Sequence, residues 1–215
     1  MGKILRILLF IILLTILPFI LLIRISVFVH VQYQLSAYPC LLIGVISTVI
    51  LLILYFTIIH QFLTGKVGDY AGIKRRSIIA ILVVTLYGFH ALFFISSGQV
   101  KSQDLRLEFL EMHPLLRLST STLAYMDKSL VMTDAQRGPE DYENMGLPSK
   151  SSSLHYTQKD GYVYALDVRV KGKSEFKNLF VTLYYRMMGF KTLRHVGTAD
   201  HLHISLYNHD KPNAR

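Results

Sequence analysis

The chain has 215 residues, a formal net charge of +9 and a mean hydropathy of +0.38. Apolar residues crowd the first 97 positions, whereas charged and turn-forming residues dominate afterwards. This composition excludes a uniformly water-soluble chain and predicts a membrane part followed by a water-exposed part. We expect no nucleic-acid partner, because several basic residues flank apolar runs and no basic stripe is interleaved with aromatic residues. The single cysteine, Cys40, excludes an internal disulfide and a Cys-rich zinc site, which leaves His, Asp and Glu as metal ligands.

Three apolar runs predict three transmembrane helices, over about residues 4–27, 40–63 and 77–96, so that residues 1–97 form a membrane domain. The first run begins with Lys3 and Arg6, as a secretory signal does. Its apolar core is nevertheless longer than the roughly 7–15 residues of a signal peptide. We therefore interpret it as a retained helix, and the bilayer as a partner of the chain.

The distribution of basic residues predicts the orientation. Lys3 and Arg6 precede the first run, and residues 64–76 between the second and third runs carry four basic residues and one acidic residue. Residues 30–38, between the first two runs, carry no Lys or Arg. The positive-inside rule places the N-terminus in the cytoplasm of a bacterial inner (cytoplasmic) membrane. Three crossings then place the C-terminal part on the periplasmic, or extracytoplasmic, side.

The remaining sequence predicts a linker over residues 98–114, part of which is a charged helix. A domain is expected over residues 115–215. The fold class expected for this domain is α+β with a small antiparallel sheet, preceded by the three transmembrane helices. Helices are expected over residues 115–125, 140–145 and 175–188. Strands are expected over residues 130–133, 161–170, 192–196 and 201–206.

Histidines carry the strongest chemical signal, because five of the nine follow position 150. In residues 201–206, strand alternation puts His201 and His203 on one face and three aliphatic residues on the other. Upstream, His155 opens a loop that leads to Asp167. Two histidines and an aspartate are a suitable ligand set for catalytic zinc, with the fourth position left for water. The same histidines could also be ordinary polar surface residues.

Two motifs strengthen the metal hypothesis by resemblance. Ser153 and His155, followed by Gly161, Ala165 and Asp167, resemble the Ser-x-His…Gly-x-Ala-x-Asp signature of the D-Ala-D-Ala metallopeptidases. That family, which includes phage endolysin peptidases, shares one zinc fold with lysostaphin-like enzymes and the hedgehog signalling domain. The two metal-binding positions are twelve residues apart here and about seven apart in the family, so residues 157–160 are expected to be an insertion.

The second motif is Asp200-His201-Leu202-His203. In the family, the last metal ligand is preceded either by an acidic residue three positions earlier or by a histidine two positions earlier. Asp200 and His201 resemble both arrangements, with His203 as the last ligand. Residues 133–139 resemble the family's strand-then-arginine segment. The resemblance covers about residues 130–206 and none of the apolar half.

The resemblance implies a zinc peptidase domain that cleaves peptidoglycan stem peptides as a carboxypeptidase or an endopeptidase. The implied Zn²⁺ ligands are His155, Asp167 and His203. Asp200 would accept the proton of the attacking water and pass it to the leaving amine, with His201 as the alternative base or a supporting group. Arg137 would steady the developing oxyanion or a substrate carboxylate, or else form a structural salt bridge.

A second hypothesis from a different class is a non-catalytic, zinc-containing domain on the same membrane anchor. Such a domain would bind cell wall or act as a sensor. Turnover of a muropeptide separates the two hypotheses, whereas metal content does not. The sequence does not determine the oligomeric state, nor does it show which peptide bond would be cleaved.

Overall fold

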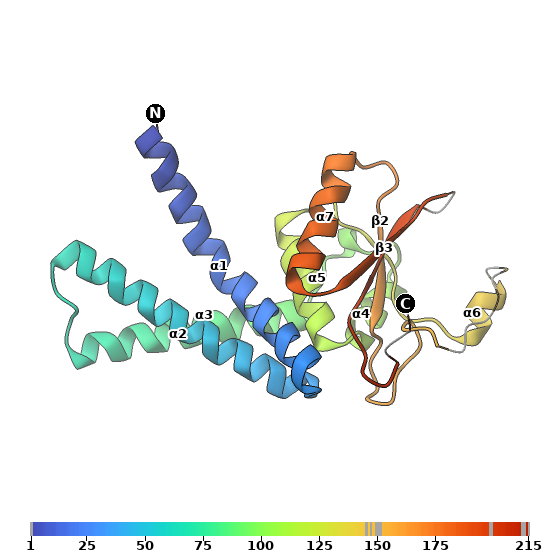
Figure 1. Ribbon diagram of the computed structural model, residues 1–215, viewed down its shortest axis with the longest axis horizontal. Helices are drawn as coiled ribbons and strands as arrows, with labels where there is room; N and C mark the ends of the chain where they lie inside the picture. The colour runs from blue at the N-terminus through green and yellow to red at the C-terminus, as the bar shows by residue number, and fades with distance from the viewer. Residues whose placement is uncertain are drawn as a thin grey trace.

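The computed structural model describes residues 2–144, 146, 148, 152–197, 200–211 and 214, and only the backbone of residues 3–14. Three long helices project from one side of a small α+β domain (Figure 1). These are α1 (Gly2–Tyr33), α2 (Ala37–Thr64) and α3 (Tyr70–Phe93). The α+β class and the three apolar helices are confirmed. Met145, at the end of the helix expected over residues 140–145, lies outside the described residues.

All three long helices are long and apolar enough to cross a membrane, which indicates membrane association. Helices α1 and α2 extend beyond both ends of the apolar runs that predicted them, whereas α3 begins earlier than its run and ends at Phe93, three residues before the run does. Helix α3 begins at Tyr70 because the Asp69 side chain caps it, accepting a 2.8 Å hydrogen bond from the Gly72 N–H. Residues 74–76, expected in a loop, are therefore helical. Hydropathy indicates only the apolar part of such a helix, whereas a capping residue such as Asp69 indicates where the helix begins.

The domain contains one antiparallel sheet with strand order β1-β2-β4-β3. The strands are β1 (Met132–Asp134), β2 (Ala165–Arg169), β3 (Lys191–His195) and β4 (His201–Ser205). The strand expected over residues 161–170 is shorter, because the backbone before it is bonded elsewhere. Val163 exchanges hydrogen bonds with Glu111 and His113, and the Tyr164 N–H donates to the Leu154 carbonyl.

The helices of the domain are α4 (Asp104–Glu111), α5 (Pro114–Met126), α6 (Pro139–Asn144) and α7 (Glu175–Met188), with a 3₁₀ turn at Ser97–Gln99. Helix α7 has the predicted bounds. Ser174 accepts from the Lys177 N–H at its start, and Gly189 ends it with φ +101°. The segment expected as a linker instead packs into the domain, since it carries α4 and buries Leu105 and Phe109.

The two faces of the sheet have different environments. Leu166, Val168, Leu202 and Ile204 are all buried, and α7 lies on the Leu202 side. The opposite face carries the predicted metal ligands of β2 and β4. The fold therefore supports these polar residues on a rigid apolar layer. Burying each large aliphatic side chain in that layer contributes roughly 1.5–3 kcal/mol of transfer free energy.

Candidate metal centre

Strand register brings the first two candidate ligands together. Asp167 of β2 lies directly opposite His203 of β4, and directly opposed residues of an antiparallel pair share a face. In the same way His195 of β3 lies opposite His201 of β4. Alternation along β4 puts His201 and His203 on one face, as predicted, with Leu202 buried on the other.

His155 reaches this face from a loop that is tied to two other segments. The Tyr164 N–H donates to the Leu154 carbonyl over 2.9 Å, and the Arg137 N–H donates to the His155 carbonyl over 3.0 Å. Residues 156–162 form a side loop closed by the hydrogen bond from Gln158 N–H to the Tyr162 carbonyl, 2.9 Å long. The extra residues between the two ligands therefore loop out without separating them.

Three potential ligand atoms form a compact triangle: His155 Nε2, Asp167 Oδ1 and His203 Nδ1. Its edges measure 3.2 Å between the two imidazoles, 2.9 Å from His203 to Asp167, and 3.6 Å from His155 to Asp167. Tetrahedral zinc ligands at 2.0–2.2 Å from the ion would lie roughly 3.3–3.6 Å apart. The donor set suits a zinc-sized divalent ion, and the 3.6 Å edge lies in this range, whereas the 3.2 and 2.9 Å edges are shorter, so the three atoms would move slightly apart to bind such an ion.

The protonation states of the three residues also suit a metal ligand set. The Ala135 carbonyl lies 2.6 Å from His155 Nδ1, so that nitrogen donates its hydrogen to the carbonyl and Nε2 is the ring nitrogen that faces the triangle. Burial lowers the pKa of His203 and outweighs the opposing effect of Asp167, which favours the neutral imidazole. Burial raises the pKa of Asp167, but hydrogen bonds with His155 and His203 hold it well below its usual value.

Arg137 holds the other oxygen of the ligand carboxylate. Its Nη2 lies 2.6 Å from Asp167 Oδ2, and its Nε lies 2.7 Å from Asp134 Oδ2. These two contacts point Oδ1 of Asp167 toward the histidines. The structure thus places Arg137 at the predicted site, in an ion pair that orients a ligand.

His201 is the more accessible imidazole beside the triangle, with a side chain 27% exposed. Its Nε2 lies 3.6 Å from Asp167 Oδ2. Its ring stacks on that of His195 with centroids 4.9 Å apart, as their opposed register positions require. A titratable group therefore lies next to the ligands and remains in contact with solvent.

Asp200 has a different environment from that of His201. The Arg194 guanidinium binds its carboxylate at 2.8 and 3.1 Å and also binds Glu175 at 2.6 Å. Arg194 pairs with Leu202 in the register, on the face covered by α7. The hydrogen bond from Arg194 lowers the pKa of Asp200. The structure thus brings His155, Asp167, His203, His201 and Arg137 together and places Asp200 in a separate ion-pair network.

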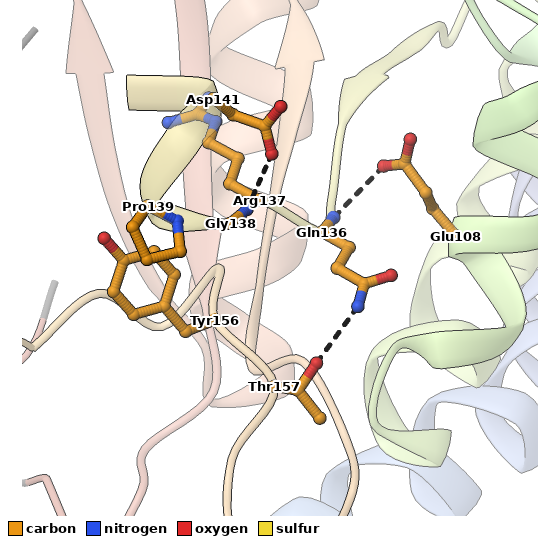
Figure 2. Close-up of a pocket in the computed structure, with 8 residues that line it drawn as sticks. All are labelled: Glu108, Gln136, Arg137, Gly138, Pro139, Asp141, Tyr156 and Thr157. Atoms are coloured by element: carbon orange, nitrogen blue, oxygen red, sulfur yellow. Dashed lines mark hydrogen bonds between the residues drawn. The ribbon is translucent and has the colours of Figure 1, made fainter. Parts of the chain in front are cut away.

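An open pocket of about 450 Å³ lies beside Arg137, lined by residues of α4, of the segment around α6 and of the His155 loop (Figure 2). Glu108 projects from α4 and accepts hydrogen bonds from the Ala135 and Gln136 N–H groups. It thereby fixes the peptide whose carbonyl orients His155. Burial raises the pKa of Glu108.

Two supporting groups had no recognisable signal in the sequence. The Ala135 carbonyl is backbone, which no residue type reveals, and Glu108 lies in the segment expected to be a linker. Conversely, period-two alternation around His201 could have indicated that His195 joins the same face. Comparison of the chain with protein-family models, curated proteins and solved structures found no match.

Proposed function

We propose that this chain is a membrane-anchored, metal-dependent hydrolase whose metal, a zinc ion, is held by His155, Asp167 and His203. The observation that carries the proposal is the triangle of two imidazole nitrogens and one carboxylate oxygen with edges of 2.9–3.6 Å. Nitrogen and carboxylate ligands in this number are typical of catalytic zinc.

His155, Asp167 and His203 would hold a divalent ion, which when bound would supply polarisation of a scissile carbonyl and activation of water at neutral pH. The protein groups then divide the remaining work. His201, 3.6 Å from Asp167 and partly exposed, is the base that accepts a proton from water and returns it to the leaving group. Arg137 keeps the Asp167 carboxylate oriented through its 2.6 Å contact.

We propose peptidoglycan stem peptides as the substrate, cleaved by carboxypeptidase or endopeptidase action. Two sequence observations support this choice. Ser153-x-His155, Ala165-x-Asp167 and Asp200-x-x-His203 follow one another in the order of the corresponding D-Ala-D-Ala metallopeptidase motifs, with Gly161 two residues further from Ala165 than the glycine of that signature. The basic residues at the start of α1, in the loop between α2 and α3 and in the first turns of α3 favour an extracytoplasmic domain in a bacterial inner membrane, on the side where peptidoglycan lies.

A non-catalytic metal-binding domain is the second candidate. It is favoured by the low exposure of the three ligands, at 2% for His155, 3% for Asp167 and 6% for His203. Structural zinc sites are closed to substrate, whereas catalytic sites keep one position accessible. The accessible His201 beside the triangle favours catalysis over this alternative.

The test is incubation of the full chain in detergent, supplied with zinc, with purified muropeptides. Mass spectrometry should detect loss of a terminal D-amino acid or cleavage of a cross-link. Asp167→Asn should abolish the product, and His60→Gln should not, because the His60 imidazole hydrogen-bonds to Thr64 and Lys66 near the end of α2 and not to the candidate ligands. A zinc-loaded chain without any turnover would reject the hydrolase and favour the non-catalytic domain.

A further inference from the structure

Helix α7 carries two apolar faces, of which only one is buried by the domain. Val181, Tyr185 and Met188 face the core, whereas a second stripe is exposed. The stripe consists of Phe176 (80% exposed), Leu179 (54%), Phe180 (42%), Leu183 (47%) and Met187 (62%). Spacings of three and four residues place these side chains on one side of the helix. A continuous apolar stripe of this kind on a surface indicates an interaction partner.

The C-terminal end of the adjoining helix α5 lies beside the last turns of the apolar helix α3. Thr122 and Tyr125, near its C-terminal end, hydrogen-bond to Tyr87 and His90 of α3. At 1.5 Å per residue, Tyr87 and His90 lie about 9 and 4.5 Å inside the end of α3 at Phe93. The domain therefore overlaps the last turns of α3 and is not separated from them by a linker.

The C-terminal end of α7 likewise lies beside a turn of α1 that is inside the end of that helix. A Cβ added to Gly189 would lie 2.7 Å from Arg24 Nη1 and 2.9 Å from Val27 Cγ1 of α1, so backbone and helix are in close contact. The adjacent turn of α1 packs at Gly44 of α2, about 10 Å inside the N-terminal end of that helix at 1.5 Å per residue.

Figure 1 shows α7 running crosswise to α2 and α3, with the sheet on the side away from them. If α2 and α3 cross a bilayer, α7 lies along its surface. Basic side chains accompany the stripe: Lys177 follows Phe176, and Lys128 lies 5.6 Å from the Tyr125 ring. An apolar stripe, flanking lysines and an orientation along the surface are the properties of an interfacial helix.

We infer that α7 is a membrane-surface helix, whose exposed stripe inserts into the leaflet that surrounds the C-terminal ends of α1 and α3. The occupant of the stripe is lipid, because α7 packs directly against α1, a helix long and apolar enough to cross a membrane. The inference is independent of the metal centre. It has a consequence for any activity there, since α7 covers the Leu202 face of the sheet and His201 and His203 project from the other. The histidines then face away from the bilayer, within a domain that is fixed at its surface.

The experiment uses the full chain with Cys40→Ser, which retains a side-chain donor for the Leu35 carbonyl, in phosphatidylethanolamine and phosphatidylglycerol vesicles. Spin labels are attached singly at Leu183→Cys and Met187→Cys. Exposed Leu54→Cys in the middle of α2 provides the lipid reference, and exposed Arg186→Cys on the polar face of α7 provides the water reference. Power saturation then compares the accessibility of each label to oxygen and to a water-soluble nickel chelate.

The expected result is an oxygen-to-nickel accessibility ratio at both stripe positions that is shifted from the Arg186 value toward the Leu54 value. Ratios equal to that at Arg186 would place the stripe in water and overturn the inference. Low accessibility to both reagents, with spin–spin broadening, would show a second copy of the chain on the stripe and also overturn it. Two independently labelled positions keep the test decisive if one variant fails to fold.

Discussion

Asp200 and Arg194 form a two-point ion pair, with Arg194 Nη2 2.8 Å from one carboxylate oxygen and Nε 3.1 Å from the other. Asp200 is the acidic residue that the sequence motif favours as the catalytic base, and here it is bound in this ion pair. The contact from Arg194 lowers the pKa of Asp200, which makes the carboxylate a weaker proton acceptor. His201, one residue later, faces Asp167 instead. The geometry therefore favours the histidine as base.

Asp200→Asn and His201→Gln should have unequal effects on muropeptide turnover. We expect His201→Gln to reduce kcat by about 10²–10⁴-fold, the usual contribution of a positioned base, while metal content is retained. Asp200→Asn should keep most of the activity, because Asp200 contacts Arg194 and not the ligands. The reverse order, measured with zinc-loaded protein, would return the role of base to Asp200.

Arg137→Gln should weaken metal binding without removing a ligand. Its guanidinium holds Asp167 Oδ2 at 2.6 Å, and loss of such an outer partner typically costs about 10–100-fold in metal affinity. Competition with a chromogenic chelator measures the zinc Kd. Lys159→Gln is the control, because its paired Asp210 lies outside the site and the contact is exposed. Equal affinities in the two variants would show that Arg137 does not support the ligand.

Gly189→Ala should destabilise the contact between the domain and α1. A residue other than glycine at φ +101° carries strain of about 1–2 kcal/mol, and the new methyl group would also lie 2.9 Å from Val27. Gly172→Ala is the matched control, with φ +81° and no atom within 4 Å of the added carbon. Thermal melting in detergent should therefore show a larger loss of Tm for Gly189→Ala. Equal losses would mean that α1 yields to the added group without cost.

His113 should make the folded chain less stable in mild acid. It is fully buried at the start of α5, where its Nδ1 accepts a hydrogen bond from the Leu115 N–H. Burial, with smaller contributions from His30 and Arg117, holds its pKa well below the usual histidine value of about 6.5. Two tyrosine rings, Tyr162 and Tyr164, complete its surroundings.

Below pH 6.5 the unfolded chain binds a proton at His113 that the folded chain does not bind. The free energy of unfolding should therefore fall with decreasing pH, by at most about 1.4 kcal/mol per pH unit from this residue. His113→Asn keeps a capping side chain but does not titrate. Between about pH 7.5 and about pH 5.5, which bracket the range in which histidine titrates, the Tm of the His113→Asn variant should fall less than the Tm of the unchanged chain. Parallel curves would exclude His113 as the source of acid sensitivity.

Much of the fold could be predicted because its signals are local. Three long apolar runs, the bounds of α7 and the alternation in β4 all follow from hydropathy or capping residues in one segment. Strand β2 was predicted too long, because Val163 and Tyr164 bond to Glu111, His113 and Leu154 through backbone contacts made only in the folded chain. The packing of Phe109 into the domain is likewise a tertiary property.

The candidate site divides in the same way. His155, Asp167 and His203 could be selected because imidazole and carboxylate groups are rare and were ordered as in a known motif. The partner of Asp200 could not be predicted, since Arg194 is brought beside it only by the turn between β3 and β4. Side-chain chemistry therefore identified the candidate ligands, whereas tertiary structure determined which neighbouring groups face them.

Metal content of the purified full chain tests the central claim most directly. After zinc is supplied and the excess removed, elemental analysis should give about one zinc ion per chain, the stoichiometry of a single three-ligand site. His155→Ala, Asp167→Ala and His203→Ala should each lose the ion, and Asp200→Ala should retain it. A folded chain that binds no metal, or ligand variants that bind as much as the unchanged protein, would contradict the account.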